Sequence, residues 1–112
     1  MLSWSSTQSG SPADLAAIAA GEGDAGLPFG AELMAFAEAI ARFDDGALTA
    51  ARERLVEAAG EAFMLDAAAV AANFEMMTRI ADGTGARNTE ESAAAREALG
   101  VRLGIDGFTS HR

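Results

Sequence analysis

Apolar residues recur at helical spacing along most of this chain. Between residues 32 and 43 they fall at i, i+3, i+4, i+7 and i+10, which places them on one face of a helix. A second helix is predicted at about 48–59, with Gly60 as its end and with charged residues outward. The run Asp44-Asp45-Gly46 breaks the chain between the two helices. The expected inward residues are Leu33, Phe36, Ala37, Ile40, Phe43, Leu48, Ala51, Leu55, Val56 and Ala59.

A longer apolar stretch predicts a helix at about 63–83, and the Gly83-x-Gly85 turn ends it. Because only a narrow strip of this helix is polar, we expect it to be buried on most of its circumference, in the middle of an assembly. In the polar strip, Arg79 lies four residues after Glu75 and three before Asp82, a spacing that predicts a structural triad around the guanidinium. The apolar faces carry Val70, Phe74, Met77 and Ala81 on one side and Phe63, Met76 and Ile80 on the next.

Capping residues predict where the outer helices begin and end. Ser11 as N-cap and Pro12 at the first helical position open a helix that Gly21 ends. Asn88 and Glu91 form a capping box for a fifth helix, which extends to about Leu99 and stops at Gly100. Because no alternating strand pattern appears, the sequence predicts an all-α fold of about five helices.

Three segments follow from these boundaries: a flexible leader at 1–10, a helical domain at 11–100 and an irregular tail at 101–112. Trp4 stands alone among the polar residues of the leader. We interpret it as a partly exposed residue on its own domain, with a subunit-contact anchor as the alternative.

Composition limits how much core a single chain can build. Apolar residues make up 50% of the 112 residues, but many of them are alanines, which bury little area each. Large apolar groups are scarce, with six Phe, five Met and one Trp. We therefore expect a homo-oligomer, with a dimer favoured, to complete the core.

Charge and cysteine content exclude several classes of function. The net charge of −9 argues against binding nucleic acid or anionic membranes. The chain has no cysteine, so it can form no disulfide, thiolate nucleophile or thiolate metal site. No membrane span or signal peptide is predicted, and we expect a cytoplasmic protein.

Residues 13–85 resemble the C-terminal portion of the alkylhydroperoxidase D / carboxymuconolactone decarboxylase superfamily. The similarity lies in ADLAAIAAGE (13–22), AELMAFAEAIARF (31–43) and the apolar helix that ends in Arg79-Ile80-Ala81-Asp82 before a Gly turn. The resemblance implies the helical fold of that family. Its redox motif, Cys-x-x-Cys with a nearby His, belongs upstream of these helices and is lacking here, so no catalytic residue carries over.

No other pattern in the chain points to catalysis. His111, the only histidine, lies one residue from the C-terminus, where nothing orients it as a general base. No Glu-x-x-His pairs for a di-iron site are present, and we predict no catalytic, cofactor-binding or metal-binding residues. Asn73 shares a side of its helix with apolar residues and is expected to bond to a neighbouring helix or subunit. Four methionines at helical spacing fit a core or interface better than a ligand pocket: Met34, Met64, Met76 and Met77.

Three hypotheses for function remain. The preferred one is a non-enzymatic helical oligomerising module, either a degenerate relative of the superfamily or one chain of a split domain whose partner supplies the Cys motif. The second is a protein that binds a small apolar ligand in the Met- and Phe-lined space between helices. The third is a cysteine-free enzyme of the same superfamily.

Overall fold

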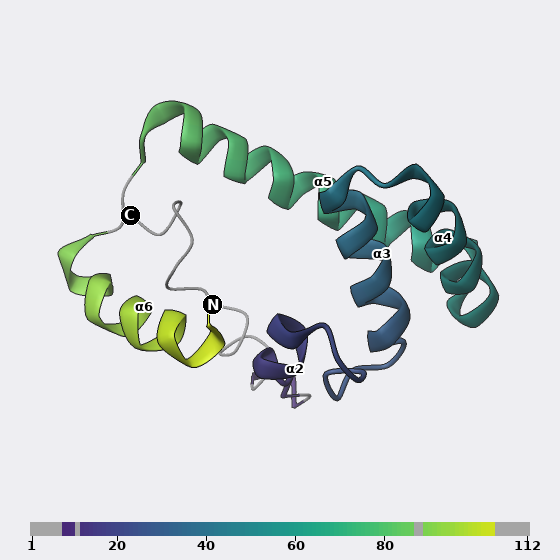
Figure 1. The fold of residues 1–112 in the computed structure, drawn as a ribbon, viewed down its shortest axis with the longest axis horizontal. Helices are drawn as coiled ribbons and strands as arrows, with labels where there is room; N and C mark the ends of the chain where they lie inside the picture. Colours follow the sequence, from purple (N-terminus) through teal and green to yellow (C-terminus); the bar gives the residue numbers. More distant parts are fainter. Residues whose placement is uncertain (1–7, 11, 87–88, 105–112) are drawn as a thin grey trace. The chain divides into compact units, whose positions relative to one another are not determined.

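The computed structural model describes residues 8–10, 12–86 and 89–104. Over these residues the chain is helical and has no strand, which confirms the predicted all-α class. It divides into two compact units, Met1–Phe74 and Glu75–Arg112, and each is described by itself. Figure 1 shows the helices in chain order: α2 (Leu15–Ala20), α3 (Gly30–Arg42), α4 (Asp45–Ala59), α5 (Glu61–Thr84) and α6 (Glu90–Leu103).

The first of these helices, α2, begins later than its sequence predicts. Its N-cap is Asp14, whose Oδ1 accepts hydrogen bonds from the amides of Ala16 (2.9 Å) and Ala17 (3.3 Å). The predicted start at Ser11-Pro12 is therefore wrong: Pro12 precedes the helix, and Ser11 lies outside the described residues. The Asp14 carboxylate accepts from two amides that have no partner within the helix, which is the role of an N-cap residue. Gly21 ends α2 as predicted, with φ of 70°.

The break between α3 and α4 occurs at Phe43, one residue before the predicted one. Phe43 takes the left-handed conformation with φ of 54°, and the amide of Asp44 donates to the carbonyl of Ala39 at 3.2 Å. Asp44 then caps α4, because its Oδ1 accepts from the amide of Ala47 at 2.9 Å. The prediction that Phe43 faces inward is wrong, since it lies beyond the helix and is 79% exposed.

The core of unit Met1–Phe74 lies between α3 and α4, which pack side by side (Figure 1). Phe36, Ala51 and Leu55 are buried there, and Leu55 is fully enclosed. Ala39, also buried, was not among the expected inward residues, whereas Ala37, which was, is exposed. Half-buried apolar residues surround this cluster: Leu33, Ala35, Ile40, Leu48, Ala59, Met64, Ala67 and Ala68.

Helix α5 is little buried within the single chain, and its expected burial in an assembly stays a prediction. It spans Glu61–Thr84, close to the predicted range, but no residue in it is buried within the chain. The side that contacts the core of unit Met1–Phe74 carries Met64, Ala67 and Ala68, while Phe74 is 54% exposed. A helix that is apolar nearly all round has no single face that must turn inward, and α3 and α4 offer it only one side to pack on.

In unit Glu75–Arg112, α5 ends as predicted, since Gly85 adopts φ of 66° and the amide of Ala86 donates to the carbonyl of Ala81 at 3.0 Å. Helix α6 differs at both ends. Its N-cap is Thr89, and it continues through Gly100 to Leu103, so the predicted stop at Gly100 is wrong. Gly104 is the residue with positive φ, at 66°.

Candidate functional site

An open groove of about 400 Å³ lies between α3 and α5 in unit Met1–Phe74. Its volume falls within the range of small-molecule sites, roughly 300–1,000 Å³. All but one of the residues that line it are apolar: Leu33, Phe36, Ala37, Phe63, Asp66, Ala67, Val70 and Ala71.

Helix α3 contributes one wall through Leu33, Phe36 and Ala37. These residues are spaced i, i+3 and i+4, so they share one side of the helix. Phe36 also belongs to the buried core and is only 4% exposed. The wall is thus held in place by the packing of α3 on α4.

Helix α5 contributes the opposite wall. Phe63, Ala67, Val70 and Ala71 follow one another at helical spacing along this side. The two alanines explain why the groove is hollow, because a methyl group fills little of the space between two helices.

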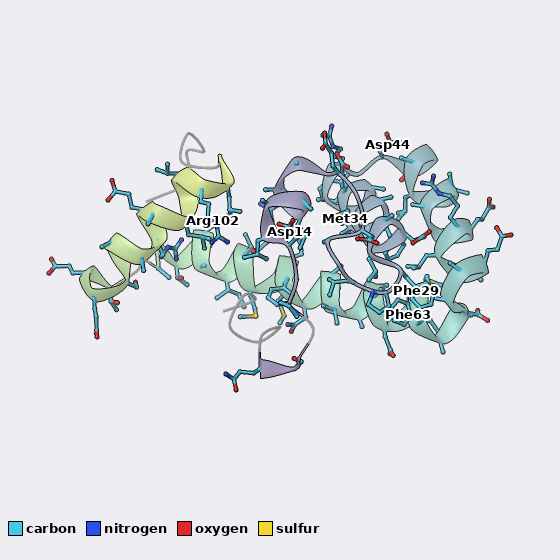
Figure 2. All side chains as sticks on the ribbon, turned by 90° about the horizontal axis from the view of Figure 1, so that it is seen from below. Asp14, Phe29, Met34, Asp44, Phe63 and Arg102 are labelled. Atoms are coloured by element: carbon cyan, nitrogen blue, oxygen red, sulfur yellow. The ribbon has the colours of Figure 1, made fainter. Side chains whose placement is uncertain are left out.

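At the start of α5, the ring of Phe63 contacts that of Phe29 edge to face, with centroids 5.5 Å apart (Figure 2). Phe29 precedes α3 in a left-handed conformation with φ of 55°. The next residue, Gly30, is buried so closely against the carbonyl of Asp24 that a side chain there would overlap it. The backbone of the loop therefore fixes the position of one ring, and that ring supports the other.

Asp66 is the only ionisable residue among those that line the groove. It is exposed, and its carboxylate forms no hydrogen bond or ion pair with the residues that the structure describes. The groove can accommodate an apolar body and offer one negative charge to it. The described residues that line it include no nucleophilic hydroxyl or thiol and no acid–base pair.

The residues singled out from the sequence lie elsewhere. None of the four methionines lines the groove: Met64 packs on the core, Met34 is half-buried, and Met76 and Met77 are exposed in unit Glu75–Arg112. Asn73 is exposed within this chain, and its expected bond to a neighbouring helix or subunit stays a prediction. Trp4 and His111 lie outside the described residues.

The predicted triad around Arg79 is only a pair. The guanidinium of Arg79 contacts Glu75 through Nε (2.8 Å) and Nη2 (2.7 Å), both on Oε1. Asp82 forms no ion pair with Arg79, although both residues are described. An i, i+4 pair lets the side chain lie along the helix, and the guanidinium then points away from the acid three residues later.

The sequence suggested a Met- and Phe-lined space between helices only as an alternative, and it did not locate the groove, because the walls come from two helices whose relative position no periodicity specifies. Its one polar member, Asp66, interrupts an apolar run and is the signal that could have drawn attention to it.

The described residues contain no group of three or more His, Cys, Asp or Glu side chains placed to hold a metal ion. None of the described helices is long and apolar enough to cross a membrane. Comparisons with known protein families, with curated proteins and with solved structures find no match to this chain.

Proposed function

We propose that this chain is a non-enzymatic helical module that acts by self-association. In this proposal it corresponds to the C-terminal portion of an alkylhydroperoxidase-like domain without the redox motif. The family relationship rests on the residues at 13–85 described above and on their helical fold. The self-association rests on one observation, the amount of large apolar surface that the described chain leaves in water.

That surface is large for so small a protein. Twelve large apolar side chains of the described residues are at least 37% exposed, while only five apolar residues are buried. A half-exposed large side chain presents on the order of 100 Å². The total is therefore comparable to the roughly 800 Å² that each partner contributes to a standard interface. Single exposed apolar side chains are ordinary in a soluble monomer, but contiguous apolar patches above a few hundred Å² are rare and mark interaction sites.

A second copy is the partner that the composition favours. The chain carries a net charge of −9, so a partner docked through charge would have to be basic, whereas apolar side chains recognise an equivalent apolar surface. Each unit contributes exposed groups, such as Leu65 and Phe74 in unit Met1–Phe74 and Ile80 and Val101 in unit Glu75–Arg112.

The mass in solution tests the proposal. Sedimentation or light scattering should give a dimer that dissociates on dilution, and the dimer should be tighter in high salt, because salt screens the repulsion between two acidic chains. Leu65→Gln and Phe74→Gln should each weaken it while leaving the helix content unchanged. Ala58→Gln, on the exposed side of α4, is the matched control. A wild-type chain that stays monomeric at high concentration and high salt would exclude self-association.

The split-domain form of the proposal makes a different prediction. If a separate chain supplies the Cys-x-x-Cys motif, this chain should remain weakly associated alone and form a stable complex with that partner. Peroxide consumption by this chain alone should equal the buffer blank, because it has no thiol.

A further inference from the structure

We infer that the groove between α3 and α5 binds a small organic cation with an aromatic or aliphatic body. The inference concerns unit Met1–Phe74 alone and does not depend on self-association. It rests on the apolar lining, the exposed ring of Phe63 and the single carboxylate of Asp66.

The lining selects for an apolar body. Leu33, Phe63 and Val70 supply apolar surface to the groove, and about 400 Å³ is enough for one ring with a short chain. Because the groove is open on one side, the ligand can keep one end in water, so an amphipathic molecule fits better than a wholly apolar one.

The charge on Asp66 selects the sign of the polar end. Its carboxylate has no cationic partner among the described residues, so an incoming ammonium group meets an uncompensated negative charge. Phe63, which is 37% exposed, lines the same groove, and aromatic rings also attract cations. The net charge of −9 further raises the local concentration of cations.

The same arrangement disfavours other ligands. A carboxylate ligand would be repelled by Asp66, and a neutral one would cover part of that carboxylate without replacing its hydration. A second copy of the chain could also enter the groove, through an apolar side chain or an arginine, and the test below separates that case.

Three probes that share one body test the charge preference: phenylbutylamine, phenylbutanol and phenylbutyrate. Each probe is titrated into the full chain, and binding is followed by the amide shifts of α3 and α5 in two-dimensional NMR. The protein concentration is held constant, and the mass of the protein is measured in parallel. The amine should bind about tenfold more tightly than the alcohol, through one ion pair and one cation–π contact, and the acid should bind most weakly.

Variants locate the site. Asp66→Asn should bring the affinity of the amine down to that of the alcohol. Asp82→Asn makes the same change of charge on the same helix outside the groove and should leave the preference intact. Ala37→Phe should fill the groove and abolish binding of amine and alcohol, whereas Ala41→Phe, one turn along α3 on an exposed position, should not.

Several results would overturn the inference. One is equal affinity for amine and alcohol in the wild type. Another is an equal loss of the preference for the amine over the alcohol in Asp66→Asn and Asp82→Asn, because the preference would then come from the overall charge of the chain. Amine binding that survives in a folded Ala37→Phe chain would place the ligand elsewhere. The groove would instead be a contact between copies if the measured mass fell as the amine bound and if the mass of the Asp66→Asn chain were lowered in the same way.

Discussion

The ring of Phe29 meets the ring of Phe63 edge to face, with centroids 5.5 Å apart and planes inclined at 65°. Phe29 immediately precedes α3, and Phe63 lies in the first turn of α5. The contact therefore ties the beginnings of two helices together beside the groove that they enclose. It is also the only aromatic pair among the described residues.

A double-mutant cycle should detect this contact. Phe29→Ala and Phe63→Ala, alone and combined, should show a coupling of about 0.5–1.5 kcal/mol in the free energy of unfolding, the usual value for an aromatic pair. Chemical denaturation measures all four proteins. Strictly additive losses would mean that the rings do not stabilise each other.

Gly30 should tolerate no side chain. It is buried, and a Cβ there would overlap the backbone carbonyl of Asp24, which cannot turn aside as a flexible side chain can. Gly30→Ala should lower the free energy of unfolding by about 3 kcal/mol or more. Gly46→Ala, in α4 of the same unit, is the matched control. Its Cβ meets only an ordinary contact at 3.6 Å, so it should be neutral or stabilising by up to about 1 kcal/mol. If thermal unfolding gave Gly30→Ala and Gly46→Ala the same stability, the close approach of Gly30 to the carbonyl of Asp24 would be contradicted.

Phe43 should be improved by glycine. It has φ of 54° at the end of α3, a conformation that costs a residue with a side chain roughly 1–2 kcal/mol, and it is 79% exposed, so little packing is lost with the ring. Phe43→Gly should therefore raise the free energy of unfolding by about 1 kcal/mol. Phe43→Ala removes the same ring and keeps the strain, so it should show no such gain. A destabilised Phe43→Gly would indicate that the ring is packed.

The part of the fold that the sequence predicts well is the pair α3 and α4. Each has one apolar face, so the periodicity identifies the inward side, and Leu55 and Phe36 are buried as expected. The same reasoning fails for α5, because a helix with apolar residues on nearly every side gives no information about which of them a single chain can cover. Ala67 and Ala68 contact the core, whereas the bulkier Leu65 and Phe74 stay exposed.

Helix ends show a second limit. The local turn geometry selected other residues than those that the sequence patterns predicted. Asp14 caps α2 in place of the expected Ser11, and α6 passes through Gly100 to end at Gly104. The groove was beyond prediction for a further reason, since it depends on the separation of α3 and α5, which local patterns do not specify.

The ion pair between Arg79 and Glu75 should contribute little. Both side chains are well exposed, at 68% and 47%, and exposed i, i+4 pairs contribute about 0.3–0.5 kcal/mol. Arg79→Met and Glu75→Gln should show a coupling of that size in denaturation, and it should shrink in high salt. Arg79→Met and Asp82→Asn should show no coupling. A coupling with Asp82 equal to that with Glu75 would restore the triad expected from the sequence.

Leu55 and Phe74 together test where the core ends. Leu55 is fully enclosed between α3 and α4, so Leu55→Ala should cost about 2–5 kcal/mol at any protein concentration. Phe74 is 54% exposed, and in dilute, dissociated protein Phe74→Ala should cost less than about 1 kcal/mol. At high concentration the loss should grow, because the ring then leaves water at a subunit contact. Denaturation at two protein concentrations measures both the loss of stability in the dissociated chain and the additional loss at the subunit contact. If Phe74→Ala cost as much as Leu55→Ala in the dilute sample, α5 would be enclosed within the single chain, as its apolar sequence first indicated.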